Sequence, residues 1–95
     1  MEIYEVILAK LVEERLIKTP KHVVVKLLAW VEGVRTNGLS AMRKIPGFHD
    51  EPVKGKKREG QRSIRLNKAY RAFYVIDEES IVHFVEVIEV NKHEY

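Results

Sequence analysis

The sequence contains no cysteine, and its hydrophobic runs are short and interrupted by charged residues. Without cysteine there is no disulfide framework and no thiolate chemistry, which fits a reducing cytoplasm. Hydrophobic runs broken this often argue against a membrane span, and residues 1–5 lack the basic start of a signal peptide. We therefore expect a cytoplasmic protein that has no membrane partner.

Several familiar motifs are also missing from the sequence. It has no phosphate-binding P-loop, no dinucleotide-binding G-x-G-x-x-G and no serine nucleophile elbow. Ligand types for a metal occur at His49, Asp50, His93 and Glu94, but not at a spacing typical of zinc or calcium sites. We expect no metal site and no cofactor.

The charge of the chain is distributed unevenly. Its 95 residues are 45% hydrophobic and 33% charged, which suits one globular domain over residues 1–95 with a net charge of +3. Residues 43–71 hold ten Lys and Arg against three Asp and Glu, a balance of +7, whereas the remaining residues balance to −4. A basic surface on an acidic body indicates nucleic acid or another polyanion as partner, although a solvated charged face is the alternative.

The hydrophobic spacing of the first half predicts one strand and then two helices. A strand is expected over residues 3–8 and a helix over residues 10–17. A second helix should run from Thr19-Pro20, with Thr19 as N-cap and Pro20 as first helical residue, to Asn37-Gly38. Two helices joined by so few residues form an antiparallel hairpin. A short helical turn over residues 39–45 follows it.

The second half predicts three longer strands. Hydrophobic alternation over residues 62–66 and 70–76 indicates an antiparallel hairpin, and residues 67–69 are its loop. Residues 81–90 are hydrophobic on both faces, so this strand should lie near the middle of the sheet. Residues 48–61 are expected to form a loop or an edge strand, because Pro52 is unsuited to a central position.

Two groups of side chains could carry chemistry. Lys54, Arg65 and Arg71 could converge on a phosphate, because a strand arginine beside a core needs an anionic partner. They could instead form salt bridges to nearby glutamates, namely Glu51, Glu59, Glu86 or Glu89. A general base and acid could likewise be found among four titratable residues that could equally be exposed polar groups, namely His49, Glu51, His93 and Glu94.

Two segments of the sequence resemble a known toxin family. G-Q-R-S-I-R-L at residues 60–66 and N-K-H-E-Y at residues 91–95, placed after a helical hairpin, resemble the RelE/ParE superfamily of toxin-antitoxin systems. The match is greatest with RelE/HigB-like mRNA interferases and covers nearly the whole chain. The resemblance implies an α+β fold, with an N-terminal helical hairpin packed on a twisted, mainly antiparallel four-stranded sheet.

The same resemblance implies a reaction. The resemblance implies that the members of this family that cleave mRNA on the ribosome promote attack of a ribose 2′-hydroxyl on the adjacent phosphate, without a metal. By motif, Glu51 matches a general base and Arg71 matches an arginine that contacts the scissile phosphate. Lys54 matches a basic residue before the glycine turn, and Tyr95 matches a tyrosine near the terminus.

The end of the chain departs from the family pattern. Glu94 stands where relatives have His or Asp, and an ionised glutamate is no general acid, so His93 becomes the candidate for that role. Which of Glu51, His93, Glu94 and Tyr95 acts as base or acid stays open. The predicted RNA-binding residues are basic and lie mostly in the +7 stretch: Lys54, Lys56, Lys57, Arg58, Arg62, Arg65, Lys68 and Lys92.

The resemblance also implies partners. A toxin of this family is paired with a cognate antitoxin protein, and a ribosome-dependent nuclease meets its mRNA on the ribosome. The alternatives are a ParE-like toxin that inhibits DNA gyrase, a catalytically inert binding toxin, and a plain RNA-binding module. The presence of Glu51, Arg71 and a His-Glu-Tyr terminus favours the nuclease, because a gyrase inhibitor needs no acid and base around a phosphate.

Overall fold

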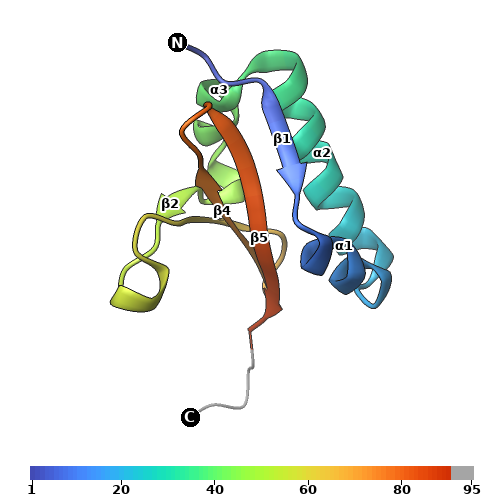
Figure 1. Cartoon of the computed structure of the whole chain (residues 1–95). Helices are drawn as coiled ribbons and strands as arrows, with labels where there is room; N and C mark the ends of the chain where they lie inside the picture. Colours follow the sequence, from blue (N-terminus) through green and yellow to red (C-terminus); the bar gives the residue numbers. More distant parts are fainter. Residues whose placement is uncertain (91–95) are drawn as a thin grey trace.

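A computed structural model describes residues 1–90 and shows helices packed on a mainly antiparallel sheet (Figure 1). The predicted order of strand, helix, helix and three long strands is confirmed, with small differences at the ends. The elements are β1 (Glu5–Leu8), α1 (Lys10–Ile17), α2 (Lys21–Asn37), α3 (Leu39–Arg43), η1 (Pro46–Phe48), β2 (Glu51–Pro52), η2 (Lys56–Arg58), β3 (Arg62–Arg65), β4 (Tyr70–Ile76) and β5 (Ile81–Glu89).

The sheet has five strands in the order β1-β5-β4-β3-β2. β1 pairs in parallel with β5, and the other neighbours are antiparallel. The prediction of four strands is wrong because Glu51 and Pro52 pair with Ser63 and Arg62 and add a fifth strand at the edge. A two-residue strand leaves no periodic pattern in a sequence, and Pro52 is acceptable there because it lies on an edge. β5 was predicted to lie near the middle of the sheet, and it is an interior strand between β1 and β4, the latter being the central strand.

The core lies between the sheet and the helices. Trp30 of α2 contacts Tyr74 of β4 and Phe84 of β5, with 5.2 Å between ring centroids in each pair, and all three side chains are fully buried. The Tyr74 and Phe84 centroids are 5.4 Å apart, so the three rings form one cluster. Ile64, Leu66 and Ala72 belong to the same core, so the alternation of the β3–β4 hairpin places these residues on its inward face.

The junction between α1 and α2 differs from its prediction. The N-cap of α2 is Pro20, and no side chain caps this helix. Thr19 is 8% exposed, and its hydroxyl donates instead to the carbonyl of Arg15 over 2.8 Å. The predicted N-cap role of Thr19 is therefore wrong, because its buried hydroxyl donates to a carbonyl in the last turn of the preceding helix, which also accepts from the N–H of Lys18 over 3.0 Å.

The β3–β4 turn has the predicted loop without a glycine. The side-chain oxygen of Asn67 accepts hydrogen bonds from the backbone N–H groups of Ala69 and Tyr70, over 2.7 and 2.8 Å. An asparagine side chain can imitate a backbone turn in this way. The turn fixes the register that places Arg65 opposite Arg71.

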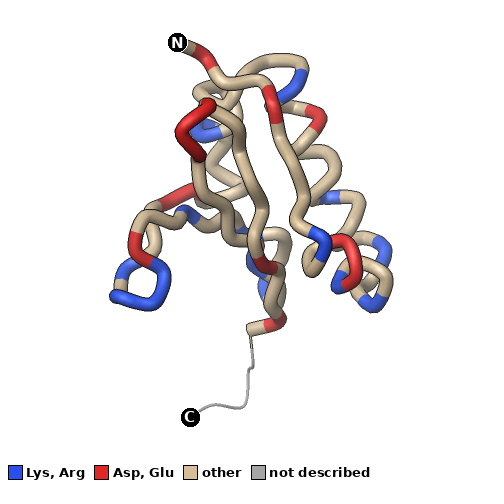
Figure 2. The backbone as a smooth tube through the Cα atoms, in the orientation of Figure 1, with Lys and Arg blue, Asp and Glu red and all other residues tan. Residues whose placement is uncertain are grey.

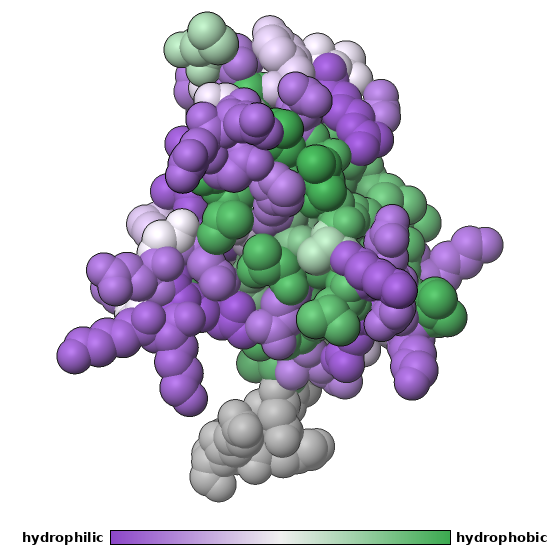
Figure 3. All heavy atoms as spheres, viewed as in Figure 1, coloured by the Kyte–Doolittle hydropathy of each residue, from purple (hydrophilic) through white to green (hydrophobic). Residues whose placement is uncertain are grey.

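The surface has a hydrophobic side and a hydrophilic side. Hydrophobic residues gather on the viewed face near β5 and α1, whereas the loop carrying η2 is hydrophilic (Figure 3). Leu11 and Ile17 of α1 are 73% and 83% exposed. No helix within residues 1–90 is long and apolar enough to cross a membrane. The exposed leucine and isoleucine thus belong to a short amphipathic helix.

Candidate active site

A hollow of about 450 Å³ lies at the β2 end of the sheet, on the face that does not contact the helices. Glu51, Lys54, Ser63, Arg71 and Phe73 line it, together with Pro52 and Val53. Strand alternation explains the lining, because Ser63, Arg71 and Phe73 point away from the core that Ile64, Ala72 and Tyr74 enter. The structure therefore brings together Glu51, Lys54 and Arg71, which the sequence resemblance had singled out.

Within residues 1–90, no carboxylate forms an ion pair with Lys54 or Arg71 in this hollow or with Arg65 beside it. The ion pairs of residues 1–90 join Arg58 to Glu86, Arg62 to Asp50 and His83 to Asp77. The alternative of strand-face salt bridges for Lys54, Arg65 and Arg71 is not seen in this part of the chain. Their charge is thus available to an anionic ligand.

Arg65 and Arg71 lie directly opposite each other on β3 and β4. Both are half-buried, and their side chains share the face that bears the hollow. Like charges at opposed positions of an antiparallel pair destabilise a sheet. A phosphate at this position would relieve the repulsion and accept hydrogen bonds from both guanidinium groups.

The basic loop between β2 and β3 is fastened to the sheet by Arg58. Its guanidinium carbon lies 3.9 Å from the centroid of the Phe73 ring, and the group also donates to Gln61 over 3.0 Å and pairs with Glu86. Lys56 and Lys57 remain exposed beside it. Figure 2 shows this basic loop on one side of the molecule and an acidic turn between β4 and β5 above it. Arg58 was predicted to bind RNA, and its guanidinium group already contacts three side chains of the protein.

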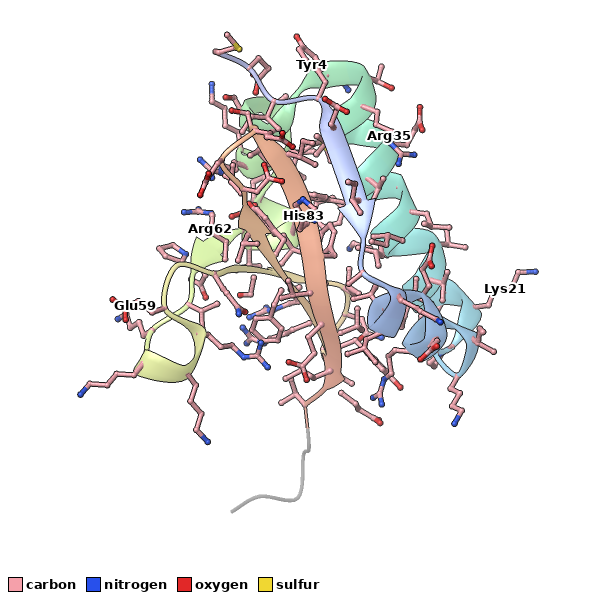
Figure 4. The ribbon with its side chains drawn as sticks, in the orientation of Figure 1. Tyr4, Lys21, Arg35, Glu59, Arg62 and His83 are labelled. Carbon is pink, nitrogen blue, oxygen red and sulfur yellow. The ribbon has the colours of Figure 1, made fainter. Side chains whose placement is uncertain are left out.

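Asp50 forms a buried polar cluster next to the hollow. Its side chain is 0% exposed; one oxygen accepts over 2.7 Å from Nε of Arg62, which Figure 4 labels, and the other accepts from the Tyr74 hydroxyl over 2.5 Å. Burial and the hydrogen bond to Asp50 raise the pKa of Tyr74 to about 12, and the nearby Arg43 acts in the opposite direction. Arg62 was predicted to bind RNA, and its Nε is engaged here. Sequence reasoning missed Asp50 and Tyr74 as partners, because no motif links them.

The raised pKa of Tyr74 predicts a loss of stability in alkali. A group whose pKa is higher in the folded state stabilises the protein fully below its unfolded pKa and loses that effect as pH rises through the folded pKa. We expect the free energy of unfolding to fall between pH 10.0 and about 12, and to fall less in Tyr74→Phe. Urea denaturation across this range measures it. Tyr4→Phe, at an exposed tyrosine, is the control, and equal slopes for both variants would contradict the assignment.

The remaining predicted residues divide into two groups. Lys68 is exposed in the turn between β3 and β4. Lys92, His93, Glu94 and Tyr95 lie outside the described residues, so the roles assigned to them stay predictions. Within residues 1–90 no group of three or more His, Asp or Glu side chains could hold a metal ion.

Solved structures share this architecture. The toxin–antitoxin complex RelBE2 from Mycobacterium tuberculosis matches with a TM-score of 0.57 and 25% identity, over 92% of this chain and 98% of that one. The archaeal RelE–RelB complex from Pyrococcus horikoshii matches with a TM-score of 0.69 and 17% identity, over 94% and 97%. The chain has the RelE/ParE fold. The predicted resemblance to this superfamily is confirmed.

Other members of the RelE/ParE fold show the same extent of likeness. The YoeB–YefM complex from Staphylococcus aureus matches with a TM-score of 0.66 and 18% identity, over 92% of this chain and 97% of that one. YafQ from E. coli matches with a TM-score of 0.68 and 13% identity, over 90% and 91%. No protein-family model and no curated protein sequence matches the chain. The RelE/ParE assignment therefore rests on structure.

Proposed function

We propose that this protein is the toxin of a toxin–antitoxin pair and acts as a ribosome-dependent, metal-independent mRNA endoribonuclease. The observation that carries the proposal is the opposed Arg65–Arg71 couple, which forms no ion pair within residues 1–90, beside a hollow that also contains Glu51 and Lys54. A carboxylate next to converging cations suits proton abstraction beside a phosphate. The RelE/ParE fold supports the same reading, because solved structures with this fold include toxin–antitoxin complexes.

In the proposed reaction Glu51 accepts the proton of a ribose 2′-hydroxyl, and the oxygen attacks the adjacent phosphorus. A positioned base contributes about 10²- to 10⁴-fold to such a step. Negative charge grows on the non-bridging oxygens, where Arg71 with Lys54 or Arg65 stabilises it. The bond to the 5′-oxygen then breaks, and this oxygen takes a proton from His93, because histidine is a residue type suited to proton transfer at physiological pH. The products are a 2′,3′-cyclic phosphate and a 5′-hydroxyl.

We propose a cognate antitoxin as the second partner. RelB and YefM are the partner chains in two of the complexes with similar structures, RelE–RelB and YoeB–YefM. An amphipathic segment suits the exposed hydrophobic residues of the helical hairpin, such as Leu11, Ile17 and Val25. An acidic segment suits the face between Lys54 and Arg71. Co-purification of the two chains tests this part of the proposal.

Mapping of RNA ends during expression tests the nuclease. We expect the wild-type chain to arrest growth and to produce new 5′ ends inside the reading frame of a reporter mRNA. The same mRNA without its start codon should remain intact, because cleavage requires a translating ribosome. Primer extension on both transcripts provides the measurement. Equal cleavage of both would contradict ribosome dependence, and growth arrest without new ends but with inhibited DNA supercoiling would favour a ParE-like gyrase inhibitor.

A further inference from the structure

The segment that carries Glu51 begins with a sharp bend. His49 has φ 47° and ψ 51°, the left-handed conformation, which few residues other than glycine adopt without cost. Its N–H donates to the carbonyl of Pro46 over 3.1 Å and closes the η1 turn. Strained backbone of this kind persists only where surrounding contacts determine it. The contacts of Asp50, the next residue, hold the backbone of His49 in this conformation.

Asp50 is attached to two strands at once. Its two carboxylate oxygens accept hydrogen bonds from Arg62 of β3 and from Tyr74 of β4. These two residues lie directly opposite each other in the β3–β4 pair. A buried carboxylate is costly unless its oxygens are hydrogen-bonded, and here each oxygen has a donor. Asp50 is therefore bound to the core side of the sheet, while Glu51 beside it pairs with Ser63 and lines the hollow on the other side.

Little else holds Glu51 in place. β2 has two residues, both exposed, and Pro52 has no N–H to donate. The next backbone hydrogen bond along the chain joins the N–H of Val53 to the carbonyl of Gln61 over 2.9 Å. A catalytic group must be held to within about 0.5 Å by its supporting contacts. An edge strand this short needs an additional attachment to meet that requirement.

We propose that Asp50 is a positioning residue, which Arg62 and Tyr74 fix in place and which thereby holds Glu51 at the candidate active site. The mechanical part of this inference rests on the contacts alone, whereas its catalytic part rests on the proposed function. The competing interpretation is that Asp50 only stabilises the fold. The two interpretations differ in whether the effect of Asp50 depends on Glu51.

A double-mutant cycle separates the two interpretations. The rate is measured in single-turnover cleavage of ribosome-bound mRNA with the variant in saturating amount. We expect Asp50→Asn to lower it by about tenfold to a hundredfold, because small displacements of a catalytic group have effects of this size. In a Glu51→Gln background the same change should cost less than about twofold, because the group that it positions is already absent. An equal fall in the cleavage rate in both backgrounds, or no fall in the wild-type background, would overturn the proposal.

Asp77→Asn is the matched control for this experiment. Asp77 also accepts from a neighbouring side chain, His83, at 2.5 Å, but it follows β4 and does not line the hollow. We expect its cleavage rate to stay within about twofold of the wild type. A loss as large as that of Asp50→Asn would show that removal of any carboxylate that accepts from a neighbouring side chain slows cleavage, and would contradict a specific role for Asp50.

Hydrogen exchange tests the mechanical part without any RNA. We expect Asp50→Asn to speed exchange of the Val53 amide by about tenfold, with little change at the amides of central β5, because the released segment opens locally. Unchanged exchange at Val53 would overturn the proposal. If the wild-type protein cleaves no RNA, the proposed function fails and this measurement alone decides whether Asp50 holds the segment. Tyr74→Phe, which removes one donor and keeps the ring, repeats both measurements should Asp50→Asn not fold.

Discussion

Arg71→Ala is expected to lower cleavage of ribosome-bound mRNA by about 10²- to 10³-fold, the usual effect of removing one donor to a developing oxyanion. Arg71 lines the hollow with Glu51 and Lys54, and within residues 1–90 no carboxylate neutralises it. The fold should not suffer, because the substitution removes one of two opposed like charges. Single-turnover cleavage and thermal unfolding of the same preparation measure the two effects.

Arg15→Ala provides the control for this result. Arg15 is an exposed arginine on α1, so its replacement removes the same charge without changing the hollow. We expect its cleavage rate to remain close to that of the wild type. Arg71→Lys should fall between the two, because lysine keeps the charge but not the planar pair of donors. A comparable loss in Arg15→Ala would mean that overall charge, rather than the site, governs the rate.

Trp30→Ala is expected to lower the free energy of unfolding by about 3–5 kcal/mol, the range for deleting a large buried aromatic side chain. Trp30 contacts Tyr74 and Phe84 and joins α2 to the two central strands. A domain of this size has a total stability of about 5–15 kcal/mol, so the variant loses a large fraction of it. Because Trp30 is the single tryptophan of the sequence, urea denaturation should be followed by circular dichroism instead of fluorescence.

Ile17→Ala is the matched comparison for the core. Ile17 is 83% exposed at the end of α1, so its truncation should change the stability by less than about 0.5 kcal/mol. A similar loss in both variants would show that the exposed face of α1 is packed in solution. A loss below about 1 kcal/mol in Trp30→Ala would contradict the assignment of the aromatic cluster as the centre of the core.

The long elements could be predicted from the sequence because each buries enough hydrophobic residues to show its period. Residues 21–37 repeat at helical spacing, residues 70–76 alternate, and β5 carries hydrophobic residues on both of its faces. The opposite orientation of Arg71 and Tyr74 also follows from alternation alone. Periodicity therefore places the basic face of the β3–β4 hairpin correctly.

The features that depend on single long-range contacts could not be predicted. β2 has too few residues to form a pattern, and the hydroxyl of Thr19 selects between two helix ends according to the local packing. The hydrogen bonds of Asp50 to Arg62 and Tyr74 join segments that no spacing rule connects. The grouping of Glu51 with Arg71 was expected from the family resemblance, not from periodicity. Sequence patterns indicate which residues of an element are buried, whereas these contacts depend on which distant segments are brought together by the fold.

The parallel pairing of β1 with β5 has a consequence for the order of folding. Glu5 pairs with Ile81, so the first strand finds its partner only in the last strand of the described chain. Closing so large a loop is entropically costly, and pairings of this range slow folding. During synthesis α1 and α2 leave the ribosome before the strand that covers their hydrophobic faces has been made. The pairing of β1 with β5 should therefore form only in the final stage of folding.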